Sequence, residues 1–227
     1  MCYSVMVRQD LQVLERDFGA RPVRTQFERY ESMTLRDPKK FRPLANHRRI
    51  YPMYFAPVVT ARQSAKWILP MRYRIRPAGS RDEVPTRYNV FNARLDSLTN
   101  RSTWRPLFGR NHGIIGISEF FEWVQDHSTH KKKVVGFSAK NVSTMYCPVL
   151  WDWWQSPESD ESFFSFAIIT GEPPAAVLAA GHDRCPVFLN AQDCDWWLSP
   201  EGTSQKVLLD RLHASTTYDW TVKDATP

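Results

Sequence analysis

Runs of β-branched and aromatic residues follow one another through the middle of this chain, with no helical segments between them at regular intervals. These runs predict strands over residues 2–7, 51–59, 65–72, 113–124, 133–139 and 163–170, and a short strand at 186–189. Helical patterns lie over residues 8–18, 22–35, 174–180, 191–198 and 203–213. A Rossmann-type fold needs a helix between successive parallel strands. The order found here instead predicts an α+β fold, with mixed or antiparallel sheets forming a barrel-like core flanked by helices.

The domain organisation predicted from the sequence is simple. A length of 227 residues fits one large domain, and a hydrophobic content of 42% supplies a sizeable core. The chain has no internal repeat, no Gly-rich phosphate loop and no low-complexity linker. We therefore expect a single compact domain over residues 1–227. Within it, Arg8–Arg49 is a basic, partly helical elaboration and residues 221–227 form a frayed tail.

Charge is distributed unevenly along the chain. Residues 1–110 carry 22 of the 30 Lys and Arg residues, 19 of them Arg, but only 9 of the 24 Asp and Glu residues. An Arg-rich basic half is the electrostatic signature of a protein that binds a polyanion, nucleic acid first. The alternative is a solvated basic surface without a partner, because charge counts do not locate the side chains.

Neither a membrane segment nor a metal site is indicated by the pattern of apolar residues and cysteines. Residues 1–20 lack the apolar core of a signal peptide, and no run approaches the ~20 apolar residues of a transmembrane helix. We expect a soluble cytoplasmic protein, nucleoid-associated if the source is prokaryotic. Cysteine spacing matches no zinc pattern, so we expect neither metal nor cofactor. Three of the cysteines are predicted to be small buried hydrophobic residues: Cys147, Cys185 and Cys194.

Cys2 differs from the other cysteines because it directly follows the initiator Met. Removal of Met1 leaves a free α-amine and a thiol on adjacent carbons. The amine can condense with an aldehyde to an imine, and the thiol can then close a five-membered thiazolidine ring. The alternative is that Cys2 only begins a buried strand.

Three further segments carry residues suited to chemistry. Asn92 and Arg94 occupy alternate positions and face the same way if the segment is extended. Glu122 lies between Phe121 and Trp123, where partial desolvation would raise its carboxyl pKa toward the range useful for acid–base catalysis. His182 lies between a predicted helix and a predicted strand. Alternatively, Asn92 caps a turn, Glu122 faces solvent and His182 is an ordinary loop histidine.

Taken together and in order, these segments resemble the SRAP family (SOS-response-associated peptidase), the abasic-site processing proteins that crosslink to single-stranded DNA. The resemblance covers essentially the whole chain. The motifs that carry it are Met1-Cys2, Phe55-Ala56-Pro57, Trp67-Ile68-Leu69-Pro70, Asn92-Ala93-Arg94, Phe121-Glu122-Trp123, the Trp-rich segment 151–154, Phe166-Ala167-Ile168-Ile169-Thr170 and His182-Asp183-Arg184-Cys185-Pro186.

The resemblance implies an enzyme that loses Met1 by autoproteolysis and attacks the ring-opened aldehyde of an abasic site through Cys2. The resulting thiazolidine shields the lesion in the DNA damage (SOS) response, and a lyase activity is possible. By the same resemblance, Asn92 orients the amine, Glu122 shuttles protons and His182 helps open the sugar ring. The residues implied to contact DNA are Arg94, Arg184, Trp67, Trp123, Pro57 and Thr170. The partner is single-stranded DNA containing abasic sites, and we expect a monomer.

Two departures from the family pattern stand out. The family begins Met-Cys-Gly-Arg, whereas Tyr3 and Ser4 follow Cys2 here, which removes one expected phosphate contact. A second acid, Glu119, precedes Glu122 by three positions and should therefore point to the opposite face of the strand. Two alternative functions stay open at this point: a cysteine peptidase acting on itself or on other proteins, and a non-catalytic module that binds single-stranded DNA.

Overall fold

The computed structural model describes residues 3–8, 10–42, 49–126 and 130–226. Its strands form one twelve-stranded sheet. The strands are β1 Ser4–Val7, β2 Arg21–Pro22, β3 Arg49–Ile50, β4 Phe55–Arg62, β5 Ala65–Tyr73, β6 Asn92–Arg94, β7 His112–Gln125, β8 Lys132–Ala139, β9 Met145–Gln155, β10 Ser162–Gly171, β11 Cys185–Pro186 and β12 Trp220–Ala225. The helices are α1 Leu11–Phe18, α2 Arg24–Arg36, α3 Ala175–Ala179, α4 Ala191–Leu198 and α5 Gln205–His213.

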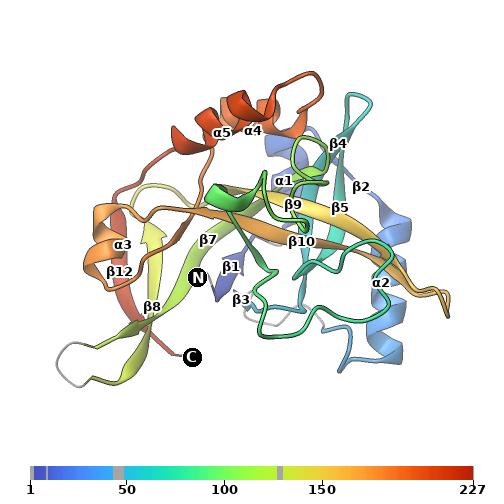
Figure 1. Cartoon of the computed structure of the whole chain (residues 1–227), viewed down its shortest axis with the longest axis horizontal. Helices are drawn as coiled ribbons and strands as arrows, with labels where there is room; N and C mark the ends of the chain where they lie inside the picture. The colour runs from blue at the N-terminus through green and yellow to red at the C-terminus, as the bar shows by residue number, and fades with distance from the viewer. Residues whose placement is uncertain (1–2, 9, 43–48, 127–129, 227) are drawn as a thin grey trace.

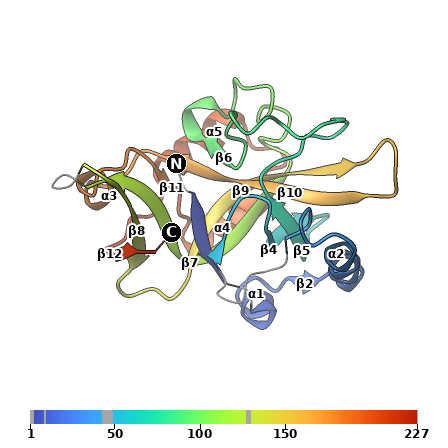
Figure 2. The same ribbon diagram turned by 90° about the horizontal axis from the view of Figure 1, so that it is seen from below.

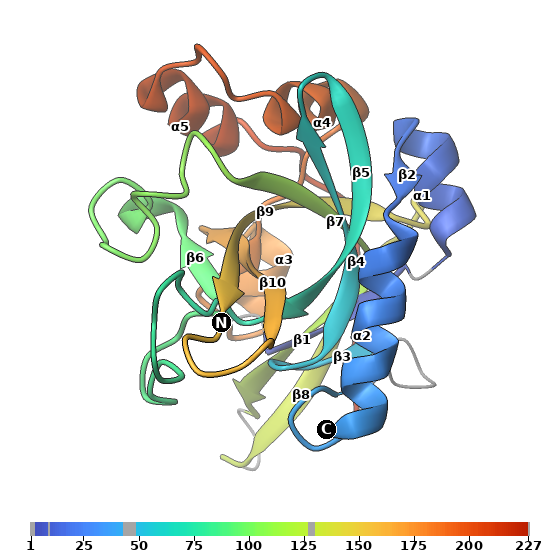
Figure 3. The same ribbon diagram turned by 90° about the vertical axis from the view of Figure 1, so that its right-hand side faces the viewer.

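Five strands close into a barrel, which confirms the predicted fold class. β10 pairs with β5, β5 with β4, β4 with β7, β7 with β9, and β9 again with β10. The β10–β5 pair is parallel and the other four are antiparallel, so the sheet is mixed as expected. Figure 3 views this ring close to its axis, with α2 along the outside of β4 and β5 and with α4 and α5 above.

Both faces of the barrel wall are buried, which explains why its strands look like continuous apolar runs rather than alternating ones. Val58 and Ile168 belong to one core cluster, whereas their neighbours Val59 and Ile169 belong to another. The second cluster includes apolar residues of α1, α4 and α5. The helices therefore cover the outside of a wall whose inner face is filled by the first cluster.

Local signals mark the ends of α1 and the start of α5. The Asp10 side chain accepts a hydrogen bond from the Gln12 N–H at the start of α1, and Gly19 ends that helix in a left-handed conformation at φ +62°. Ser204 caps α5 by accepting from the Val207 N–H, as predicted. No helix within the described ranges is both long and apolar enough to cross a membrane.

Three segments differ from their predictions. The strand expected at 51–59 begins only at Phe55 and runs to Arg62 as β4, because residues 52–53 form a turn. The residues expected to fray after Trp220 instead form β12, which pairs with β8 over six residues from Trp220 to Ala225. This expectation was wrong because it considered only the polar sequence of the tail. In the fold, the edge strand β8 has backbone groups with which the tail pairs. The strand expected at 186–189 is shorter, since only Cys185–Pro186 pairs with β10, and Leu189 makes an isolated bridge to Tyr146.

Candidate active site

Glu122 and His182, which are 60 residues apart in the sequence, meet beside the part of β7 that pairs with β1 and β8. Glu122 lies in β7 with only 1% of its surface exposed, and its Oε2 is 3.2 Å from Nε2 of His182. Gly181 precedes His182 at φ +96°, a conformation that favours glycine, and so turns the chain sharply after α3. The His182 N–H donates to the Val177 carbonyl, which anchors the histidine to that helix.

Burial acts on both members of this pair. It raises the pKa of Glu122 to about 8, with Asp183 adding to the rise, and it lowers the pKa of His182. Both shifts favour the neutral forms of the two groups, and the 3.2 Å separation allows a protonated Glu122 to donate to Nε2. The backbone of Arg184 offers Nδ1 a carbonyl oxygen at 2.9 Å and an N–H at 3.2 Å, so either tautomer of His182 has a partner. A proton can therefore pass between Glu122 and His182.

Glu119 lies away from this pair, as its spacing on the strand predicts. It packs against β8, where a Cβ added at Gly136 would come within 2.3 Å of the Glu119 carboxylate. Burial raises its pKa, and the cations of Lys223 and Arg49 oppose the rise. Strand alternation therefore separates two acids that are only three residues apart.

Asn92 is buried at the start of β6, and its orientation is held on both sides. The Tyr73 hydroxyl donates to the Asn92 Oδ1 at 3.2 Å. The Asn89 side chain accepts from the N–H groups of Phe91 and Asn92, which shapes the turn into the strand. Asn92 then pairs with Ile168 of β10. The Asn92 amide is therefore a fixed group rather than a mobile cap.

Arg94 and Arg184 converge on one carboxylate. Arg94 donates to Asp96 through Nε at 3.1 Å and Nη2 at 2.5 Å, and Arg184 Nη2 lies 3.9 Å from the same carboxylate. Thr170 of β10 is the common neighbour, because it pairs with Arg94 on one side and Pro186 on the other. The two arginines thus lie on one side of the molecule although 90 residues separate them in the sequence.

Trp123 and the N-terminal strand lie next to Glu122. Trp123 follows Glu122 in β7, is 37% exposed and has its ring 6.4 Å from that of Tyr3. The Tyr3 N–H donates to the Phe121 carbonyl at 3.3 Å. Cys2, the predicted nucleophile, lies outside the described residues.

Unlike Arg184, which is two residues from His182, Trp67 and Pro57 have no described contact with the Glu122–His182 pair. Trp67 is near the start of β5, six residues from Tyr73, which corresponds to roughly 20 Å along a strand. There it lines a surface pocket with Arg62 and Arg110. Pro57 is buried within β4, opposite Pro70 of β5.

Residues 1–225 match the family described as SOS response associated peptidase (SRAP). The chain belongs to the SRAP family. Among its relatives, the abasic site processing protein YoqW of Bacillus subtilis is 27% identical over 143 residues, 63% of this chain and 62% of YoqW. The abasic site processing protein HMCES of Pongo abelii is 22% identical over 214 residues, 78% of this chain and 59% of HMCES. The matched region is thus less than two thirds of either relative.

Solved structures show the same SRAP-like fold. A crystal structure of a protein from Bacteroides thetaiotaomicron has a TM-score of 0.74 at 18% identity, covering 99% of this chain and 92% of that one. A protein from Bordetella bronchiseptica has a TM-score of 0.69 at 16% identity over the full length of both chains. At these identities, the similarity establishes the fold alone.

Two site residues of this SRAP chain were missed by sequence reasoning. Tyr73 carries no signal, because nothing in the strand pattern shows that its hydroxyl reaches Asn92. Asp96 follows Arg94 by two positions, and that spacing was the available hint of a carboxylate partner.

The remaining cysteines are unsuited to nucleophilic attack. Cys147, Cys185 and Cys194 are buried, as predicted, and burial raises the pKa of all three thiols. Within the ranges that the structure describes, no group of three or more His, Cys, Asp and Glu residues is arranged to hold a metal ion.

Proposed function

We propose that this chain processes abasic sites in single-stranded DNA by forming a thiazolidine crosslink through Cys2 after Met1 is removed. The observation that carries the proposal is the buried Glu122–His182 pair, 3.2 Å apart, on the strand that pairs with the residues directly following Cys2. The names of the relatives, all abasic site processing proteins, support the same substrate.

The proposed chemistry balances without a cofactor. Hydrolysis of the Met1–Cys2 peptide bond consumes one water and frees the α-amine. The amine attacks C1′ of the ring-opened sugar, and the carbinolamine loses water to give an imine. The thiol then adds across the C=N bond, with sulfur bonding to carbon and its proton passing to nitrogen. The net change on ring formation is the loss of one water.

Each polar group of the site has a step that suits it. Loss of hydroxide from the carbinolamine needs an acid that still holds its proton near neutral pH, which a Glu122 pKa of about 8 provides. His182 can exchange a proton with the sugar as the furanose opens. Asn92, fixed by Tyr73, can hold the amine through a hydrogen bond.

Peptidase activity in this proposal is confined to the removal of Met1. Burial of Cys147, Cys185 and Cys194 leaves Cys2 as the candidate nucleophile, and a free α-amine beside that thiol would serve no purpose in general proteolysis. Cys2-dependent cleavage of unrelated peptides would contradict this assignment.

DNA is proposed to reach the site across Arg94 and Arg184, which can contact phosphates without reading sequence. Trp123, next to Glu122 in the sequence, offers an exposed ring to the DNA, and Thr170 is proposed to contact the DNA backbone. Pro57 and Trp67 keep their predicted DNA contacts as part of the proposal, Trp67 at the far end of β5. The protein is proposed to act as a monomer.

The test compares crosslinking by matched acid variants. Purified protein is incubated with a single-stranded oligonucleotide carrying one abasic site, and covalent product is followed on a denaturing gel. Cys2→Ala should give no product. Glu122→Gln should slow product formation by about 10²- to 10⁴-fold, as expected for loss of a general acid.

Glu119→Gln is the control, because it removes a half-buried carboxyl from the same strand on the opposite face. It should crosslink at nearly the wild-type rate. Mass spectrometry of each protein shows whether Met1 is present. Equal crosslinking by the Cys2→Ala protein, or by a wild-type protein that retains Met1, would refute the mechanism.

A further inference from the structure

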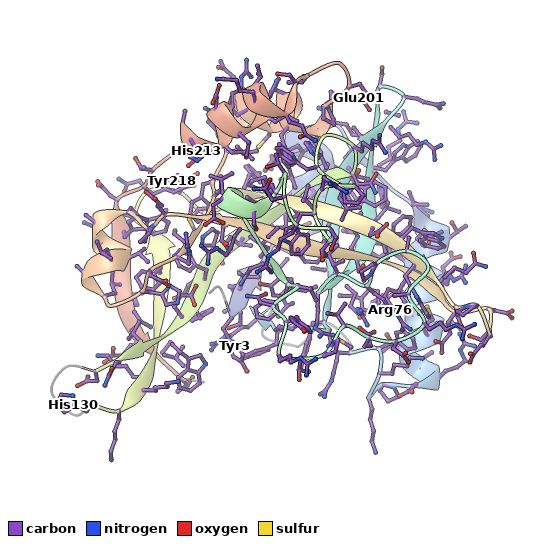
Figure 4. The ribbon with its side chains drawn as sticks, in the orientation of Figure 1. Tyr3, Arg76, His130, Glu201, His213 and Tyr218 are labelled. Atoms are coloured by element: carbon purple, nitrogen blue, oxygen red, sulfur yellow. The ribbon has the colours of Figure 1, made fainter. Side chains whose placement is uncertain are left out.

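Four aromatic side chains form a continuous row along the N-terminal strand. Within this row the Trp123 and Tyr3 rings are 6.4 Å apart, Tyr3 and Tyr51 are 5.5 Å apart, and Tyr51 and Tyr54 are 5.9 Å apart. We call Trp123, Tyr3, Tyr51 and Tyr54 the aromatic row. Trp123 lies in β7, Tyr3 directly precedes β1, and Tyr51 directly follows β3. Tyr3 is labelled in Figure 4, and the blue strand β1 lies beside β7 in Figure 2.

The row is exposed where large aromatic side chains are usually covered. Tyr3 is 40% exposed and Trp123 is 37% exposed, while Tyr51 and Tyr54 are half-buried. Tyr3 meets both of its neighbours at steep interplanar angles of 74° and 67°. Edge-to-face packing of this kind leaves a ring face available for another flat π-system.

Two fixed connections join the row to the candidate active site. At one end, Trp123 directly follows Glu122 in β7, with its side chain on the opposite face, and the Tyr3 N–H donates to the Phe121 carbonyl. At the other end, the turn that carries Tyr51 and Tyr54 bonds to Tyr73, through Met53 N–H to Tyr73 O at 2.7 Å and Tyr73 N–H to Tyr54 O at 2.8 Å. The hydroxyl of the same Tyr73 holds Asn92. The row is therefore linked to the site through the backbone, and its side chains lie on the opposite face of β7 from the Glu122 carboxyl.

A cation lies against the row, although it also interacts with Glu119 and donates to the Thr226 carbonyl. The Arg49 guanidinium lies 3.7 Å from the centre of the Phe121 ring and 5.2 Å from that of Tyr51, and its Nε donates to Ser4 Oγ at 3.0 Å. Arg49 comes from a segment more than 40 residues away in the sequence and places its charge beside Tyr51 and Ser4.

We propose that the aromatic row is a stacking platform for unpaired bases of single-stranded DNA on one side of the lesion. This inference rests on the proposed function and extends its binding surface beyond the family motif residues. Aromatic side chains accept any base because every base has a π-face, so the platform tolerates all sequences. Duplex DNA is excluded, because its base faces are covered by their neighbours in the stack.

Tyr51 is the position at which to test the row, because it is central and is not in the proposed catalytic machinery. Affinity is measured by fluorescence anisotropy with lesion-free single-stranded DNA, and stacking by the quenching of 2-aminopurine placed at successive positions. Tyr51→Ala should weaken binding about 5- to 100-fold, the range for loss of one base–aromatic stack. Tyr51→Phe should restore affinity, whereas Tyr51→Leu, which keeps apolar bulk without a ring, should not.

Trp196→Ala is the matched control. The Arg211 guanidinium lies 4.4 Å from the centre of the Trp196 ring, but this ring is on α4, away from the row. It should leave both affinity and quenching unchanged. Wild-type affinity in the Tyr51→Ala protein, within twofold, would overturn the inference and favour a protein partner for this surface. Crosslinking of an abasic oligonucleotide, measured in parallel, separates the two proposals. Tyr51-sensitive binding without crosslinking refutes only the chemistry, and crosslinking with Tyr51-insensitive binding refutes only the platform.

Discussion

At the scale of single residues, the two acids of β7 show how one strand gives similar groups different roles. Burial raises the pKa of both Glu119 and Glu122, but Glu119 faces Lys223 and Arg49, whereas Glu122 faces His182. The shift is larger for Glu122, to about 8, because almost none of its surface is exposed. The cost of ionising this carboxyl therefore links the proposed acid chemistry to the stability of the fold.

This link predicts a specific pH dependence of stability. Between about pH 6.5 and 8 the folded state holds a proton on Glu122 that the unfolded chain, with an ordinary carboxyl pKa near 4.3, has already released. The unfolded state then binds fewer protons, so the free energy of unfolding should fall as pH rises, by at most about 1.4 kcal/mol per pH unit. The pKa of His182 is lowered, so its effect on the free energy of unfolding has the opposite sign, and that effect falls mainly below its unfolded pKa of about 6.5.

Urea denaturation of the wild type at several pH values across this window measures the slope. Glu122→Gln should flatten it, because the variant has no proton to lose there, while Glu119→Gln should keep most of it. A wild-type stability that rises from pH 6.5 to 8 would show that Glu122 is ionised in the folded protein.

At the scale of elements, the segment from β5 to β6 is held by three buried arginines that share one acid. Glu83 accepts from Arg72 Nη1 at 2.6 Å, Arg74 Nη1 at 3.2 Å and Arg76 Nη1 at 3.3 Å. Arg72 also lies over the Phe163 ring and Arg76, labelled in Figure 4, over the Trp154 ring. Each arginine donates as well to a backbone carbonyl of its own segment, at Arg74, Val84 and Arg81. The segment that leads to Asn92 is thus tied by charge rather than by regular structure.

Removing the shared acid should therefore destabilise the protein. We expect Glu83→Ala to lower the free energy of unfolding by about 2–3 kcal/mol, below the ~3–5 kcal/mol of a fully buried pair because the Glu83 side chain is 34% exposed. Asp96→Ala, which breaks the exposed pair with Arg94, should cost less than about 1 kcal/mol. Chemical denaturation measures the loss of stability in both variants. Equal losses would contradict the role of Glu83 as the shared partner of the three arginines.

β12 has a structural role that its own sequence does not reveal. Its Trp220 ring packs 5.6 Å from that of Phe120 and 5.5 Å from that of Phe188. Truncation after Asp219 should remove this contact, expose the edge of β8 and lower the free energy of unfolding by at least about 2 kcal/mol. A truncated protein with wild-type stability would show that the tail frays after all. Truncation after Ala225 is the control and should have little effect.

At the scale of the whole molecule, the uneven charge of the chain does not correspond to two domains. Asn92 and Arg94 come from the basic half, and Glu122 and His182 come from the acidic half. β6 and β11 both pair with β10, which brings Arg94 close to Arg184, and His182, two residues before Arg184, contacts Glu122. In Figure 1 the blue strand β1 lies beside the yellow-green β7, so the first and second halves of the chain share one sheet.

A DNA-binding site built in this way should respond to salt in a residue-specific manner. If Arg94 contacts one phosphate, Arg94→Gln should weaken binding to single-stranded DNA of any sequence and reduce the slope of log K against log salt by about 0.7. Arg16, which pairs with Asp17 on α1, offers a surface control: Arg16→Gln should leave the slope unchanged. Titrations at several salt concentrations give both slopes, and an unchanged slope for Arg94→Gln would remove Arg94 from the interface.

The prediction from sequence succeeded for those helices and strands whose bounds are set by a local pattern of residues. The bounds predicted for α4 match the structure, and the strands at 113–124, 133–139 and 163–170 are confirmed within about two residues as β7, β8 and β10. It left the aromatic residues 151–154 unassigned although they lie in β9. It also missed β12, because pairing with a distant strand leaves no trace in the tail itself.

The sequence by itself determined which segments are buried, where α4 begins, that Glu119 and Glu122 point apart, and which family the motif order resembles. These properties depend on neighbouring residues, whose spacing along a strand or helix is set by backbone geometry. Only the tertiary structure decided that His182 reaches Glu122, that Tyr73 holds Asn92, that Asp96 joins Arg94 to Arg184, and that Tyr51 continues the row begun by Tyr3. Each of these contacts joins segments that are distant in sequence or separated by a turn, and the closed barrel sets their distance and burial.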